Sequence, residues 1–274
     1  MTTSRHAAVP SRLSGLAESV SPDRLRWDVA SWSGALHPRM LGRRRYGQAI
    51  PGHERVYQYH IRKSAGTSLV YAFFALAGED PPEVERRLPA RHFTTSGSYV
   101  FVEHDKRLIN RGNYFFGSSH IPAWDLDVPA GSFTVTVLRD PVDRVRSLWK
   151  YLRDPGSDTG YAFPAPPEQR RWAADGFEAF LERIPAFHLL NQIHMFSRRG
   201  SVDEAAAQIR ALSCVLRTDR FADDLSRLGQ ALGLPLTARS ERKTAPIEPL
   251  DDRHLTQLRE KLEPEYRMLR LVDT

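Results

Sequence analysis

A single cysteine, Cys214, is present among the 274 residues of the chain, inside the apolar run 211–216. One cysteine excludes an internal disulfide and any metal site built on several thiolates, so the sequence favours a reducing compartment. The chain also lacks a run near the ~18 apolar residues of a membrane span, and residues 1–30 lack the apolar segment of a secretion signal. We therefore expect a cytoplasmic protein with no membrane contact.

A concentrated block of basic charge is missing as well. Lysine and arginine together number 39 against 33 acidic residues, which gives a formal net charge of +6, but the basic residues are spread along the chain. A non-catalytic protein that binds nucleic acid or another anion remains one hypothesis, and it predicts binding that weakens steeply with salt. Because there is no basic stripe, we expect no nucleic-acid partner and favour a smaller anionic ligand.

Two regions differ in their pattern. Residues 1–52 mix serine, proline, arginine and glycine without periodicity, which predicts an irregular N-terminal arm with a short helix, and residues 53–274 predict a single domain. The predicted strands are 55–61, 98–103, 113–117, 133–138 and 213–217, and the predicted helices are 69–77, 142–151, 176–184, 203–212, 221–232 and 251–271. Strands that alternate with helices indicate an α/β fold with a central parallel sheet and helices on both faces.

The first strand leads into the loop Arg62, Lys63, Ser64, Ala65, Gly66, Thr67 and Ser68. Small residues let the backbone approach a ligand, and the start of the following helix attracts anions. Lys63 is placed to neutralise phosphate oxygens and to stabilise charge on a leaving phosphate. The lysine precedes the glycine, so the spacing is not that of a P-loop. A nucleoside or metabolite kinase with a divergent phosphate loop nevertheless remains an alternative.

A second strand-to-helix junction follows residues 133–138. Arg139 stands at the strand end, where a guanidinium can bind a phosphate with paired hydrogen bonds, and Asp140 is expected to cap the next helix. Ser147 offers a hydroxyl about two turns further along that helix. The sequence favours a solvated helix face for Arg144 and Arg146. Because the carboxyl ends of parallel strands share one edge of a sheet, both junctions are expected to lie side by side there.

Both segments resemble those of a known enzyme family. The run from His60 to Leu69 resembles the 5'-phosphosulfate loop of sulfotransferases that use 3'-phosphoadenosine 5'-phosphosulfate (PAPS), most closely the carbohydrate 2-O-sulfotransferase type, although that family usually has Pro and Thr where Arg62 and Ser64 stand. The run from Val137 to Trp149 is similar to their 3'-phosphate segment. The resemblance implies a three-layer, P-loop-like sulfotransferase fold with PAPS as co-substrate and no metal.

The resemblance also assigns roles to residues. It implies that residues 62–68 bind the phosphosulfate, with Lys63 also acting in catalysis, and that Arg139 and Ser147 bind the 3'-phosphate. In the run 239–244, Arg242 stands where related enzymes place a basic loop over the nucleotide, although a solvated charge run is an equal interpretation. The implied acceptor is a hydroxylated small molecule, a natural product or secondary metabolite, or a glycan, and the loop 154–167 is a candidate flap over it.

Transfer to a hydroxyl needs a base, and histidine is the usual one near neutral pH. His120 follows a predicted strand and resembles the base of the family, although two serines separate it from Gly117. His104 and Glu103 are the next candidates. His60 is expected to be a core histidine, and no spacing of side chains predicts a metal site.

Overall fold

The computed structural model describes residues 46–88, 92–153, 165–238 and 250–273. Most of the predicted arm, residues 1–45, lies outside the described residues. Residues 46–52 have neither helix nor strand, apart from an isolated bridge between Ile50 and His53.

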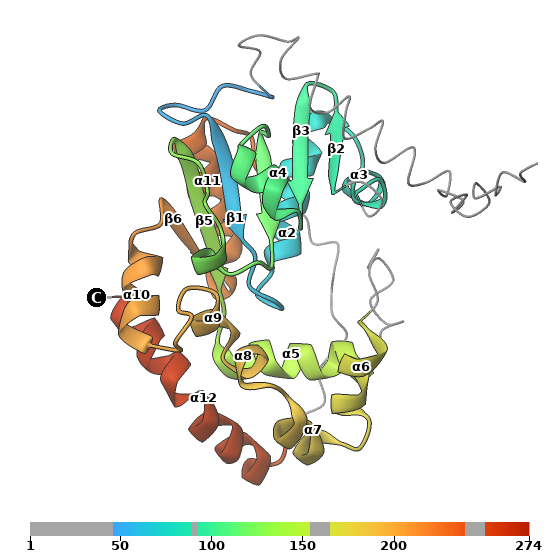
Figure 1. The fold of residues 1–274 in the computed structure, drawn as a ribbon, viewed down its shortest axis with the longest axis vertical. Helices are drawn as coiled ribbons and strands as arrows, with labels where there is room; N and C mark the ends of the chain where they lie inside the picture. The colour runs from blue at the N-terminus through green and yellow to red at the C-terminus, as the bar shows by residue number, and fades with distance from the viewer. Residues whose placement is uncertain (1–45, 89–91, 154–164, 239–249, 274) are drawn as a thin grey trace, which may run out of the picture. The chain divides into compact units, whose positions relative to one another are not determined.

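A six-stranded sheet forms the centre of the described domain, with the order β2-β3-β4-β1-β5-β6 (Figure 1). Its strands are β1 (Arg55–Tyr59), β2 (Phe93–Ser96), β3 (Tyr99–Glu103), β4 (Phe116–Ser119), β5 (Ser132–Leu138) and β6 (Cys214–Arg217). All neighbouring strands are parallel except β2 and β3. The prediction of an α/β fold with a central sheet flanked by helices is therefore confirmed.

One edge strand, β2, runs antiparallel to the otherwise parallel sheet. Strand β2 is polar and was not predicted, because Thr94, Thr95 and Ser96 give no apolar alternation. Gly97 follows with φ of 56°, in the left-handed region that glycine adopts without strain, and it reverses the chain into β3.

Helices and short helical turns make up most of the remaining described chain. They are α2 (Gly66–Phe74), α3 (Pro81–Arg86), α4 (Lys106–Arg111), α5 (Pro141–Arg153), α6 (Pro167–Arg170), α7 (Phe177–Arg183), α8 (Ala186–Leu189), α9 (Asn191–His194), α10 (Val202–Arg210), α11 (Phe221–Leu232) and α12 (Asp252–Val272). Within the ranges that the structure describes, no helix combines the length and apolar character needed to cross a membrane.

Each face of the sheet is covered by its own hydrophobic cluster. Helices α2 and α11 pack on one face, where Phe73 of α2 stacks on Phe116 of β4 with ring centroids 4.1 Å apart. Helices α4, α10 and the C-terminal part of α12 contribute to the cluster on the other face, around Tyr57 and Tyr59 of β1. A third cluster joins α5, α7 and α12 beyond the end of the strands (Figure 1). Full burial of one such phenylalanine contributes about 1.5–3 kcal/mol.

The order of the strands changes direction at β1, because the strands that precede β5 in the sequence lie on one side of β1, and β5 and β6 lie on the other. Strand β4 pairs with one side of β1 and β5 pairs with the other. In open α/β sheets, such a change of direction leaves a crevice beyond the carboxyl ends of the central strands, and ligands bind there. The loop that follows β1 and the residue that follows β5 are therefore placed at the same crevice.

Candidate active site

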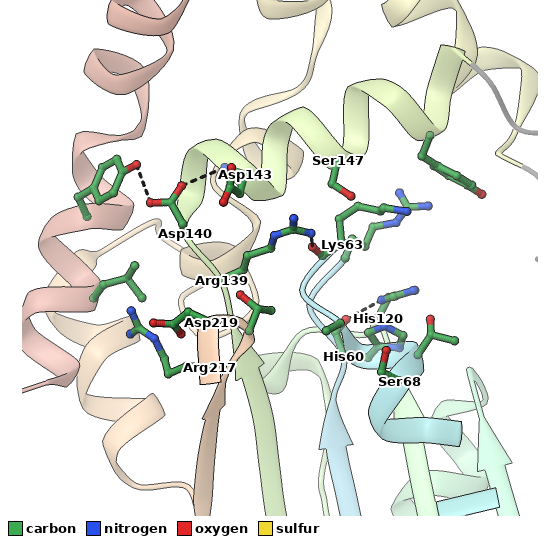
Figure 2. Close-up of a pocket in the computed structure, with 18 of the residues that line it drawn as sticks. His60, Lys63, Ser68, His120, Arg139, Asp140, Asp143, Ser147, Arg217 and Asp219 are labelled. Atoms are coloured by element: carbon green, nitrogen blue, oxygen red, sulfur yellow. Dashed lines mark hydrogen bonds between the residues drawn. The ribbon is translucent and has the colours of Figure 1, made fainter. Parts of the chain in front are cut away.

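A cavity of about 960 Å³ lies at the carboxyl edge of the sheet (Figure 2). It is lined by residues from the loop after β1, from the ends of β3, β4, β5 and β6, and from α5 and α12. The predicted site residues that line it are Arg62, Lys63, Ala65, Gly66, Thr67, Ser68, Glu103, His104, His120, Arg139 and Ser147. The topology thus brings both predicted junctions and all three candidate bases to one cavity.

The loop after β1 has a strained backbone. Lys63 and Ala65 have φ of 64° and 55°, in the left-handed region that side chains with a Cβ rarely adopt. The carbonyl of Gly66 accepts a hydrogen bond of 3.1 Å from Nε2 of the buried Gln58, which ties the loop to β1. Ser64 differs from its neighbours, because its side chain is fully buried and does not line the cavity.

Gly66 is required by a close approach. A Cβ at this position would lie 2.0 Å from Cδ2 of His60, so the imidazole occupies the space that any larger residue would need. His60 was expected in the core, but it lines the cavity and its ring centroid lies 4.3 Å from that of His120. Burial holds the pKa of His60 well below its usual 6.5, and the nearby His120 lowers it further.

Arg139 connects the two junctions. Its Nη1 donates to the carbonyl of Lys63 at 3.0 Å, and its side chain points into the cavity near Ser147 (Figure 2). Burial lowers the pKa of Arg139. As predicted, Asp140 caps α5, because its Oδ1 accepts from the amide of Asp143 at 3.0 Å.

The expectation for Arg144 was wrong. Its side chain is 0 % exposed and forms an ion pair of 3.3 Å with Glu265 of α12. It also donates to the carbonyls of His188 and Leu189. Periodicity along α5 could not show this, because the partner lies 121 residues away in the sequence. Arg146 is half-buried and pairs with Asp143 at 3.7 Å.

His120 directly follows β4. Compared with the predicted strand 113–117, β4 begins three residues later and ends two residues later, so Ser118 and Ser119 belong to the strand and His120 follows its carboxyl end. Nδ1 of His120 lies 2.6 Å from the carbonyl of His60. A carbonyl only accepts, so Nδ1 carries the proton and Nε2 keeps its lone pair. The ring lines the cavity, and the surrounding protein desolvates it.

The other two candidate bases lie beside His120. Desolvation and the neighbouring His104 lower the pKa of His120 to about 3, and desolvation lowers the pKa of His104 to about 4. Burial raises the pKa of Glu103 to about 8, with Glu85 contributing in the same direction. At neutral pH this end of the cavity therefore presents neutral imidazoles and a largely protonated carboxyl group.

Several lining residues were not predicted. Arg217 ends β6, Thr218 and Asp219 follow it, and Tyr266 and Arg270 come from α12. The residues Arg217, Thr218 and Asp219 could have been predicted, because the strand 213–217 was expected in a parallel sheet, whose strands end at the same edge. The contribution of α12 depends on long-range packing that periodicity does not reveal.

Some predictions fall outside the described residues. These include Arg242 with the run 239–244 and most of the candidate flap, residues 154–164. Across the described ranges, no group of three or more His, Cys, Asp or Glu side chains is arranged to hold a metal ion. Comparison of the sequence with protein-family models and with curated proteins found no match.

Proposed function

We propose that the protein is a PAPS-dependent sulfotransferase with the P-loop-like sulfotransferase fold. It transfers a sulfuryl group to a hydroxyl of a small-molecule, natural-product or glycan acceptor. The observation that carries the proposal is the cavity itself, which brings the Lys63 loop, Arg139 with Ser147, and His120 together. These three segments are distant in the sequence, and each carries the residue types that a donor nucleotide or a base requires.

The donor end of the cavity suits a nucleotide with two anionic groups. Residues Arg62 to Ser68 surround the start of α2, where backbone amides and the positive end of the helix favour a phosphate. Arg139 and Ser147 lie on the neighbouring junction and would bind a second phosphate. A nucleotide phosphorylated at both ribose positions has this distribution of charge.

The acceptor end suits a polar hydroxyl compound. It is lined by His60, Glu103, His104 and His120, with Arg62 beside them. Imidazole, guanidinium and a protonated carboxyl group are hydrogen-bonding partners for hydroxyl groups.

The transfer step follows from this arrangement. Nε2 of the neutral His120 takes the proton of the acceptor hydroxyl while the acceptor oxygen attacks sulfur. The bond between sulfur and the 5'-phosphate oxygen breaks in line, and adenosine 3',5'-bisphosphate leaves. Lys63 stabilises the negative charge that develops on the departing phosphate. An anionic donor beside His120 also raises the pKa of its imidazole, which favours proton uptake.

A transfer assay tests the proposal. The protein is incubated with PAPS and a panel of hydroxylated metabolites and sugars, and sulfated products are detected by mass spectrometry. We expect Lys63→Ala and His120→Ala to lose transfer by about 100-fold or more. Arg227→Ala removes an exposed arginine of α11 that does not line the cavity, and it should retain full activity. A Lys63→Ala protein with an unchanged rate contradicts the proposed role, and transfer from ATP with magnesium favours the kinase alternative.

A further inference from the structure

Two adjacent residues of α9 form hydrogen bonds with the backbones of the two loops that line the cavity, the loop after β1 and the loop after β5. Oδ1 of Asn191 accepts a hydrogen bond of 3.1 Å from the amide of Arg62, in the loop after β1. Oε1 of Gln192 accepts one of 3.0 Å from the amide of Arg139, after β5. Asn191 and Gln192 are buried, at 7 % and 0 % exposure, and they are not among the residues that line the cavity. Their contacts are therefore with the loop backbones and leave the ligand space free.

Gln192 extends the hydrogen bonding of the sheet by one residue. Strand β6 pairs with β5 as far as Leu138, where Leu138 faces Arg217. At the next residue, Gln192 contacts both backbone groups of Arg139, because its Nε2 also donates to the carbonyl of Arg139 at 3.1 Å. One side-chain amide thus supplies the donor and the acceptor that a neighbouring strand would supply. The backbone of Arg139 is held in place although β6 has ended.

Gln192 is itself fixed by a buried charge. Glu265 of α12 accepts from the backbone amide of Gln192 at 2.8 Å and from its Nε2 at 2.9 Å. Glu265 is fully buried, and Arg144 of α5 supplies the opposite charge. A buried amide with hydrogen bonds to a carboxylate and to a backbone has one allowed orientation, because exchange of Oε1 and Nε2 would place donors against donors. The orientation of Gln192 is therefore determined by Glu265.

We propose that Asn191 and Gln192, here called the loop brace, are positioning residues that set the separation of the two loops, with Glu265 fixing the orientation of Gln192. This inference rests on the proposed function, since it concerns the nucleotide that both loops would bind. The two loops would bind two phosphates of one ligand, so a change in their separation would weaken the contacts to both phosphates. In an active site, a misplacement of about 1 Å can lower the reaction rate about 100-fold.

The direct hydrogen bond between the two loops also supports a fixed separation. Arg139 donates to the carbonyl of Lys63, so its guanidinium both links the loops and points into the cavity. The guanidinium of Arg139 can keep this contact and also bind a phosphate only if the backbones of both loops are already fixed. The loop brace supplies this, through Asn191 on one loop and Gln192 on the other.

Calorimetric titration with adenosine 3',5'-bisphosphate tests the loop brace. Gln192→Ala and Asn191→Ala are each expected to weaken binding by about 10- to 100-fold. The matched control is Ser197→Ala, which removes a fully buried hydroxyl that donates to Glu204 at 2.6 Å and is not part of the cavity. The free energy of unfolding in urea is measured for every variant. We expect Ser197→Ala to lose stability while it binds the nucleotide as the unaltered protein does.

Gln192→Glu separates positioning from simple packing. The glutamate has the same shape and still accepts from the amide of Arg139, but it loses the donor to the carbonyl of Arg139 and faces Glu265. Protonation of the new carboxyl group restores one donor. The affinity of this variant, relative to the unaltered protein at the same pH, should therefore be low at high pH and recover as the pH falls.

The outcomes distinguish the two proposals. If the unaltered protein does not bind adenosine 3',5'-bisphosphate, the proposed function is wrong and the loop brace falls with it. If the unaltered protein binds the nucleotide and folded Asn191→Ala and Gln192→Glu proteins bind it equally well at every pH, the loop brace alone is wrong. These two variants keep the test decisive even if Gln192→Ala does not fold.

Discussion

Replacement of Arg144 by methionine should lower the free energy of unfolding by about 3–5 kcal/mol. Methionine keeps an apolar stem in the site but removes the guanidinium. The carboxylate of Glu265 is 0 % exposed and then lacks the guanidinium that lies 3.3 Å from it in the unaltered protein. The carbonyls of His188 and Leu189 lose a donor as well. Domains are stable by about 5–15 kcal/mol, so the single change removes a large share of the total.

Urea unfolding followed by circular dichroism measures this loss, and a second substitution tests its cause. The double variant Arg144→Met with Glu265→Gln removes the unpaired charge, and the oxygen of the new amide can still accept from Gln192, as Glu265 now does at 2.8 Å. We expect the double variant to regain about 1–4 kcal/mol over Arg144→Met alone. A loss below about 1 kcal/mol for Arg144→Met, as for exposed ion pairs, would refute the account of a buried charge network.

Three further predictions concern the cavity itself. Gly66→Ala places a methyl group against the ring of His60 and should cost about 1–3 kcal/mol of stability, measured in urea, and displace the imidazole. Arg139→Lys should weaken the binding of adenosine 3',5'-bisphosphate by about 10-fold or more, measured by calorimetry, because an ammonium cannot replace the paired contacts of a guanidinium. The pKa of His120 is about 3 in the folded protein and 6.5 in the unfolded chain. Between these pH values the unfolded chain binds more protons than the folded protein, so the free energy of unfolding falls as the pH drops from 6.5 toward 3. His120→Gln should make this fall less steep in urea unfolding across that pH range; an unchanged slope would show that His120 is not desolvated.

Short sequence patterns predicted much of the fold. Helix α11 begins and ends at Phe221 and Leu232 as its periodicity predicts. The short run of apolar and β-branched residues in β5 marks that strand, and Asp140 and Pro141 mark the start of α5. Each of these signals lies within a few residues of the structure it specifies. For this reason the two junctions, and with them most of the candidate site, could be predicted before the fold was known.

Features that depend on distant partners could not be predicted. The start of β4 was misplaced because Tyr114 and Phe115 are buried just before the strand and look like part of it in the sequence. Arg144 looked like a surface residue because Glu265 is remote in the chain, and the contact of Gln192 with Arg139 spans 53 residues. Charge and amide groups in the core have no periodic signature, since their positions are set by tertiary packing.

A calorimetric comparison of three nucleotides with the unaltered protein tests most directly whether the cavity binds a nucleotide with both a 3'- and a 5'-phosphate. Adenosine 3',5'-bisphosphate, adenosine 5'-monophosphate and ATP with magnesium are titrated under the same conditions. We expect that the bisphosphate binds most tightly and that Arg139→Ala removes its advantage over the monophosphate, because Arg139 and Ser147 would bind the additional phosphate. Equal affinity for the bisphosphate and the monophosphate, or a preference for ATP, would contradict this expectation.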